Sequence, residues 1–127
     1  MDLIYRDEVY QIVGACMTVY KDKGQGFVEP VYQECVEIEL AHLCIQFEAQ
    51  RSLELHYRNQ RLKCGFIPDL VCYNKIIVEL KAVKCLTDDH RKQLLNYLKA
   101  TGFELGLLVN FGNPNGFEWE RMVRTNR

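Results

Sequence analysis

The sequence has no long apolar run, no repeats and no low-complexity segment, and each absence narrows the class of protein. No stretch approaches the ~20 apolar residues that cross a bilayer, so we expect no membrane span. The first ten residues, MDLIYRDEVY, lack the basic and then apolar pattern of a secretory signal, so the cytoplasm is the expected location. A length of 127 residues predicts a single domain over residues 1–127.

Paired cysteines are also absent, although cysteine itself is not scarce. Six cysteines lie singly in apolar-patterned segments, and none forms a CxxC pair. Without an export signal, this spacing predicts buried free thiols and argues against disulfides and against a zinc or iron–sulfur site. The six are Cys16, Cys35, Cys44, Cys64, Cys72 and Cys85.

A strong net charge is missing too, but the small total hides an asymmetry. The formal net charge is −1. Residues 1–48 carry nine acids and three bases, hence −6, and residues 49–127 carry eight acids and thirteen bases, hence +5. The total lacks the footprint of a tight, non-specific nucleic-acid binder, while the basic C-terminal part permits a local patch.

The hydrophobic pattern that is present predicts two helices, three strands, a helix and two further strands. Val9, Ile12, Val13 and Cys16 recur at helical spacing, whereas alternation begins near residue 46. The resulting fold class is α/β, in the order ααβββαβ(β), with a mixed sheet that contains an antiparallel meander and is flanked by helices. The expected helices are 7–22, 29–43 and 87–102, and the expected strands are 46–57, 62–73, 76–83, 105–111 and 117–124.

Three charged residues interrupt the apolar stretch FIPDLVCYNKIIVELKAV, residues 66–83. In the strand 76–83, alternation places Glu79 and Lys81 on one face and leaves the other face wholly apolar. A turn near Asn74 would place Asp69 opposite Glu79 to Lys81, although a slip of one residue would break this alignment.

Two explanations of this charged group stay open. Lys81 could form a surface ion pair with Asp69 or Glu79, which contributes only ~0–1 kcal/mol. The neighbours on that face are apolar, however, and two covered carboxylates that converge repel each other unless a divalent cation lies between them. Lys81 could then hold a water or stabilise developing negative charge.

These residues resemble the PD-(D/E)xK nuclease superfamily. Pro68-Asp69 is followed by Glu79-x-Lys81, and GFVEPVY (26–32) matches the pattern Gly-x-x-Glu-x-x-Tyr of the GxxExxY protein family. The resemblance runs over essentially the whole chain and also includes the QLLNY and GLLVNF stretches. It implies a restriction-endonuclease-like core and a metal-dependent phosphodiesterase.

The resemblance also implies roles for single residues. Asp69 and Glu79 would be ligands of Mg²⁺ or Mn²⁺, the backbone carbonyl of Leu80 a further ligand, and Lys81 the catalytic lysine. Glu29 would complete the metal site from a helix, although a carboxylate at a helix start is favoured by the dipole alone. Glu34, about one turn along, is the other candidate for this position, but it matches no motif position.

The remaining candidates concern substrate binding. Gln93 and Tyr97 are four residues apart on one helical face, and in related nucleases such a pair contacts the substrate. The alternative is a solvated Gln93 beside a half-buried Tyr97. Tyr32 is either a core residue or a substrate-facing hydroxyl, and His90 is more typical of a helix cap or of the surface than of a catalyst.

The sequence therefore predicts a Mg²⁺-dependent nuclease that hydrolyses phosphodiester bonds in nucleic acid, with DNA as the expected substrate. The alternative is a catalytically silent module of the same fold that binds nucleic acid or a protein. A chain this short would gain a substrate groove from a homodimer or from a protein partner. DNA or RNA, strand preference and pathway stay open.

Overall fold

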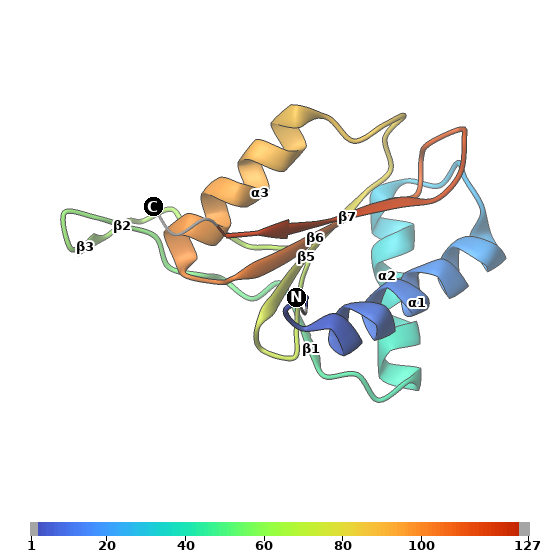
Figure 1. The fold of residues 1–127 in the computed structure, drawn as a ribbon, viewed down its shortest axis with the longest axis horizontal. Helices are drawn as coiled ribbons and strands as arrows, with labels where there is room; N and C mark the ends of the chain where they lie inside the picture. Colours follow the sequence, from blue (N-terminus) through green and yellow to red (C-terminus); the bar gives the residue numbers. More distant parts are fainter. Residues whose placement is uncertain (1–2, 125–127) are drawn as a thin grey trace.

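The computed structural model describes residues 3–124 and shows a mixed five-stranded sheet between helices (Figure 1). Helices α1 and α2 cover one face of the sheet, and α3 covers the other. The helices are α1 (Arg6–Lys23), α2 (Glu29–His42) and α3 (Asp88–Thr101). The strands are β1 (Phe47–Ala49), β2 (His56–Tyr57), β3 (Gln60–Arg61), β4 (Leu70–Cys72), β5 (Ile76–Lys81), β6 (Leu105–Asn110) and β7 (Glu118–Val123).

The strand order in the sheet is β1-β4-β5-β6-β7. Only β5 and β6 run parallel, because α3 is the crossover between them, whereas the other neighbours are antiparallel. Strands β1, β4 and β5 form the expected meander, and the expected α/β class is confirmed. The buried strands β5 and β6 lie at the centre, which explains their nearly continuous apolar sequence.

Each face of the sheet has its own core. Alternation in β5 sends Ile76, Val78 and Leu80 to the side of α1 and α2, where they are almost fully buried. Ile77 faces α3 and packs with Leu94 and other α3 residues. Glu79 and Lys81 follow on this second face, so the charged residues lie at the end of the α3-side core.

The ends of α3 agree with the sequence signals. Thr87 is the N-cap, and its hydroxyl accepts a hydrogen bond from the backbone N–H of His90. The His90 side chain accepts in return from the backbone N–H of Thr87, which completes a capping box. Gly102 ends the helix with φ of 82°, a conformation that glycine adopts without strain.

The strands expected at 46–57 and 62–73 are wrong as continuous elements. The first ends at Ala49 because Gln50 adopts a left-handed φ of 60°, and the second keeps only β4 in the main sheet. The intervening chain makes one isolated bridge, Leu53 to Phe66. It then forms a separate two-stranded arm, β2 and β3, that extends away from the body (Figure 1).

All six cysteines are free, but the expectation that they are buried is correct only for Cys16 and Cys72. Cys35 is half-buried, and the other three are exposed because they lie in connecting segments outside the core. Ile67, expected on a covered face, is also exposed. Across residues 3–124, no helix has the length and apolar character that crossing a membrane requires.

Candidate active site

Asp69, directly before β4, lies beside Glu79 of the neighbouring strand β5. The register pairs Leu70 with Val78, so Asp69 falls opposite Glu79 as expected. The backbone N–H of Asp69 donates to Glu79 Oε1 at 2.9 Å, and the backbone N–H of Leu80 donates to Asp69 Oδ2 at 2.7 Å. These two bonds fix both carboxylates at the carboxyl end of β5.

Both carboxylates have raised pKa values. Burial is the main cause for Glu79, followed by repulsion from Asp69, and together they raise its pKa to about 7. Burial also raises the pKa of Asp69, although the bond from Leu80 and the charge of Lys81 act in the opposite direction. For both carboxylates, burial thus outweighs the nearby positive charge and raises the pKa.

The Lys81 ammonium lies near this pair without an ion pair. It favours ionisation of both carboxylates at a distance, yet within residues 3–124 it makes no side-chain hydrogen bond or salt bridge. A simple surface ion pair with Asp69 or Glu79 therefore does not describe the arrangement. The lysine remains available to a further group, such as an anion or a water.

Glu29 reaches the same end of β5 from the first turn of α2. Its Oε2 accepts a hydrogen bond from the backbone N–H of Ala82 at 3.2 Å, and its charge raises the pKa values of both Asp69 and Glu79. Glu29 is exposed and stands beside the pair rather than in a closed cluster. Within residues 3–124, the exposed side chain of Glu34 makes no hydrogen bond or ion pair.

The donor set suits a hard divalent cation. In the described part of the chain, no three Asp, Glu, His or Cys side chains come close enough to form a ready-made metal cluster. Mg²⁺ needs only one or two carboxylates, because it keeps several waters and takes substrate oxygens. The Leu80 N–H points toward Asp69, and the carbonyl of a strand residue points to the same side as its N–H, so Leu80 offers a further oxygen there.

Gln93 and Tyr97 reach this site from α3. Together with Phe66 and His90 they line a small cleft that also contains Glu79 and Lys81. The Tyr97 ring stacks on Phe66 with ring centres 3.8 Å apart, whereas Gln93 is exposed. Since the His90 side chain is engaged with the backbone of Thr87, His90 acts as a helix cap at the cleft wall.

Tyr32 is fully buried, which favours the packing alternative over a substrate-facing hydroxyl. Its ring stacks on Phe111 with ring centres 4.4 Å apart. Its hydroxyl donates to the carbonyl of Gly24 and accepts from the N–H of Phe27. Tyr32 therefore fixes the loop that precedes Glu29, which explains the spacing of these two residues in the Gly-x-x-Glu-x-x-Tyr pattern.

Sequence reasoning missed a polar clamp behind the site. Asn110, fully buried at the end of β6, donates from Nδ2 to the Val83 carbonyl at 2.8 Å and accepts at Oδ1 from the Val83 N–H at 2.9 Å. Glu118 accepts a second bond from Asn110 Nδ2 at 2.8 Å. The signal was an asparagine at the end of an otherwise apolar strand.

Gln33 was also missed. Its Nε2 donates to the backbone carbonyl of Asp69 at 3.0 Å and to Glu37 at 2.9 Å. Gln33 lies four residues after Glu29, on the same face of α2. One face of this helix thus contacts the chain just before β4, at Asp69, and just after β5, at Ala82. The signal in the sequence was only this four-residue spacing.

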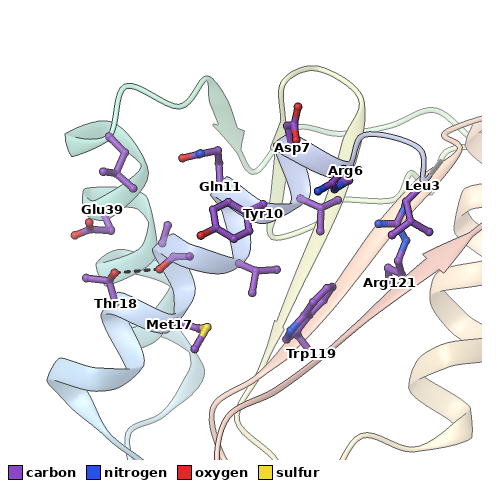
Figure 2. A pocket seen from close by; sticks show the side chains of 15 residues that line it. Leu3, Arg6, Asp7, Tyr10, Gln11, Met17, Thr18, Glu39, Trp119 and Arg121 are labelled. Carbon is purple, nitrogen blue, oxygen red and sulfur yellow. Dashed lines mark hydrogen bonds between the residues drawn. The ribbon is translucent and has the colours of Figure 1, made fainter.

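A broader groove, of about 690 Å³, lies on the opposite face of the sheet (Figure 2). Tyr10 and Met17 of α1 and Trp119 of β7 line it. Trp119 pairs with Val109, whose side chain belongs to the core under α1 and α2. None of the candidate site residues lines this groove, so it is separate from the carboxylate site.

Comparisons with known proteins agree with this architecture. The chain is similar to the crystal structure of SSO0001, with a TM-score of 0.61 and 18% identity over 77% of this chain and 50% of the other. It is also similar to an alkaline exonuclease, LHK-Exo, from Laribacter hongkongensis, with a TM-score of 0.50 and 12% identity over 70% and 52%. The chain thus spans about half the length of either structure. No curated protein matches it.

A family model described as the PD-(D/E)XK nuclease superfamily matches residues 6–122. This range contains the meander, the Asp69, Glu79 and Lys81 group, and the crossover helix α3. The structural likenesses show the same type of fold. The chain therefore belongs to the PD-(D/E)XK nuclease superfamily.

Proposed function

We propose that this protein is a Mg²⁺-dependent nuclease that hydrolyses phosphodiester bonds in DNA. Family membership and an exonuclease among the similar structures support a nuclease. The observation that carries the finer proposal is the hydrogen-bonded pair of Asp69 and Glu79, with raised pKa values, beside the Lys81 ammonium, which has no ion pair within residues 3–124. Such perturbed groups beside a cleft are typical of catalytic sites.

Asp69, Glu79 and the Leu80 carbonyl would hold the cation, with Glu29 as an outer ligand or a water contact. When bound, the ion would activate a water and neutralise the charge that develops on the phosphate. Mg²⁺ and Mn²⁺ both accept such oxygen donors. The loop fixed by Tyr32 positions Glu29, and we assign the chain to the GxxExxY family on Gly26, Glu29 and Tyr32.

Lys81 would contribute its positive charge to the reacting phosphate or orient the attacking water. Its place on the same face of β5 as Glu79 keeps it at the metal side of the sheet. Gln93 and Tyr97 would contact the substrate from the opposite wall of the cleft. Removing one group that stabilises transition-state charge typically costs about 10²–10³ in rate.

The test is cleavage of labelled single- and double-stranded DNA with Mg²⁺, Mn²⁺ or EDTA. Asp69→Asn and Lys81→Ala are compared with wild type and with Glu34→Gln, a carboxylate of α2 outside the site. We expect metal-dependent cleavage that falls at least about 10²-fold in both site variants and stays unchanged in the control. Thermal unfolding checks that each variant is folded.

Cleavage that survives in both folded site variants would contradict the site assignment. Absence of cleavage by the wild type would favour the second candidate, a silent module that binds nucleic acid or a protein. This candidate is favoured by one observation: within residues 3–124, no three Asp, Glu, His or Cys side chains form a ready-made metal site. A homodimer or partner that completes the site would then be tested by adding cell extract to the cleavage assay.

A further inference from the structure

The β2–β3 arm, residues 54–63, is exposed except at Leu55, which packs against the α3-side core. His56 pairs with Arg61 and Tyr57 with Gln60, and the turn residues Arg58 and Asn59 both have left-handed φ values, of 50° and 63°. Two such residues match the twist of a tight hairpin, so the arm is a defined structure rather than an irregular loop. Residues 56–65 are all exposed. Beyond Leu55, which packs against the α3-side core, the exposed residues of the arm have no packing role, and this suggests a binding role.

A groove separates the arm from α3. It measures about 500 Å³. Leu55, His56 and Leu62 line it on the arm side, and Lys92, Gln93 and Asn96 line it on the helix side. The two walls therefore differ, since one is mainly apolar and the other carries amides and an ammonium group.

The groove borders the candidate active site. Gln93 and Tyr97 line both this groove and the small cleft that contains Glu79 and Lys81. A chain lying in the groove would therefore contact two side chains that also border this cleft. The two hollows share this stretch of α3.

The chemistry of the walls fits a single nucleic-acid strand. Unpaired bases can pack on the apolar arm wall, where Leu62 is 42% exposed. Tyr57, farther along the arm and not itself a lining residue of the groove, offers a ring that is 68% exposed. In a duplex the base faces are already stacked and cannot use such a wall. Lys92 and Arg58, which have no ion pair within residues 3–124, can contact phosphates.

Some charges around the groove favour binding of a polyanion, and others oppose it or are already engaged. Residues 51–65 contain four bases and one acid, Glu54. Arg51 is engaged with Glu48 and Asn74, and Arg61 lies 3.8 Å from Glu54 on the other side of the arm. Asp89 lines the groove and opposes an anion there. Specific contacts from Lys92 and Arg58 must therefore carry the binding.

We propose that the groove between the β2–β3 arm and α3 guides a single nucleic-acid strand to the Asp69, Glu79 and Lys81 site. This inference rests on the proposed nuclease function, because it assigns the path by which substrate enters. The arm supplies an apolar wall for bases and Arg58 for a phosphate. The helix supplies Lys92 for a second phosphate, with Gln93 and Asn96 as polar contacts between them.

Equilibrium binding without turnover tests this path. Fluorescence anisotropy in EDTA is measured with a labelled oligothymidylate and with a labelled duplex of the same length. The variants are the double charge variant Arg58→Gln/Lys92→Gln and the wall variant Tyr57→Ala/Leu62→Ala. Lys21→Gln, on α1 at the other face of the sheet, is the matched charge control, and circular dichroism checks the fold of each variant.

We expect the wild type to bind the single strand more tightly than the duplex. The double charge variant should lose about tenfold in single-strand affinity. The slope of log affinity against log salt should become shallower by about 1.4, since each lost phosphate contact contributes ~0.7 on single strands. The wall variant should weaken single-strand binding with little change in that slope, because base contacts are not ionic.

Three results would overturn the inference. Unchanged affinity in both folded arm variants would exclude the groove as the path, and an equal loss in Lys21→Gln would indicate diffuse charge binding. If the duplex binds more tightly and the variants weaken its binding in the same way, the groove binds a duplex rather than a single strand. Since EDTA prevents turnover, these outcomes are independent of whether the protein cleaves DNA.

Discussion

At the scale of single residues, the pKa of Glu79 links the site to stability. In the unfolded chain a glutamate titrates near 4.5, whereas burial and then Asp69 raise the pKa of Glu79 to about 7. Between these values the folded state holds a proton that the unfolded state releases. The metal-free protein should therefore lose stability as pH rises through this window, by an amount on the order of 1–3 kcal/mol.

Glu79→Gln removes this titration. Urea unfolding in EDTA at pH 5 and pH 8 should show a smaller loss of stability with pH in the variant than in the wild type. Glu34→Gln, an exposed carboxylate outside the site, should behave like the wild type. Equal pH dependence of stability in wild type and Glu79→Gln would mean that folding does not raise the pKa of Glu79.

Asn110 should contribute more to stability than its size suggests. Asn110→Ala would leave the half-buried N–H and carbonyl groups of Val83 without these partners, along with one bond to Glu118. A fully buried group left unpaired costs about 1–3 kcal/mol, and the Val83 groups are only half-buried, so we expect a total loss of about 1–3 kcal/mol in urea unfolding.

Asn115→Ala is the control for this prediction. Asn115 is exposed, and its side chain makes no hydrogen bond to any residue from 3 to 124. The control should change the free energy of unfolding by less than about 0.5 kcal/mol. A loss no larger in Asn110→Ala than in the control would show that the clamp is dispensable.

At the scale of elements, two glycines differ in the space around them: Gly112 lies against backbone, whereas Gly14 borders open space. A Cβ on Gly112, just after β6, would lie 2.6 Å from backbone atoms of Ala82 and Val83. A Cβ on Gly14, in α1, would meet nothing within 4 Å. The chain after β5 therefore depends on glycine at 112, whereas the helix does not depend on glycine at 14.

Gly112→Ala should displace the chain that follows Lys81 and so reduce both stability and nuclease activity. Gly14→Ala should raise stability by up to about 1 kcal/mol and leave activity unchanged, because alanine is the better helix former. Differential scanning calorimetry and the DNA cleavage assay measure both effects. Equal behaviour of the two variants would contradict the close approach at Gly112.

At the scale of the whole molecule, cation binding should stabilise the fold. A ligand that binds only the folded state at about 100 times its dissociation constant adds roughly 2.7 kcal/mol. For a domain of this size we expect Mg²⁺ or Mn²⁺ to raise the midpoint of thermal unfolding by about 5–15 °C. The cation would also relieve the repulsion between Asp69 and Glu79.

Asp69→Asn is the variant that tests whether this stabilisation arises at the site. Its unfolding midpoint should hardly respond to Mg²⁺, while Glu34→Gln should respond like the wild type. Calorimetry with and without EDTA provides the comparison. A rise of the same size in Asp69→Asn would place the cation elsewhere on the molecule.

The sequence by itself determined the features that depend on local physics. Helical spacing located the three helices, Thr87 and Gly102 marked the ends of α3, and alternation in β5 placed Glu79 and Lys81 on one face. The turn at Asn74 set the register that brings Asp69 to Glu79. In each case a few neighbouring residues suffice, because the backbone geometry repeats with a known period.

Only the tertiary structure decided the features that depend on distant segments. The strand expected at 46–57 is interrupted after β1, and within residues 3–124 its middle forms only the isolated bridge from Leu53 to Phe66. Its last two residues form β2, which pairs with β3 outside the main sheet. Tyr32 is a core residue because its ring stacks on Phe111, which lies far along the chain. Asn110 is a clamp because its side chain hydrogen-bonds to the backbone of the distant Val83. Burial and pKa values follow from such long-range contacts, which no local pattern records.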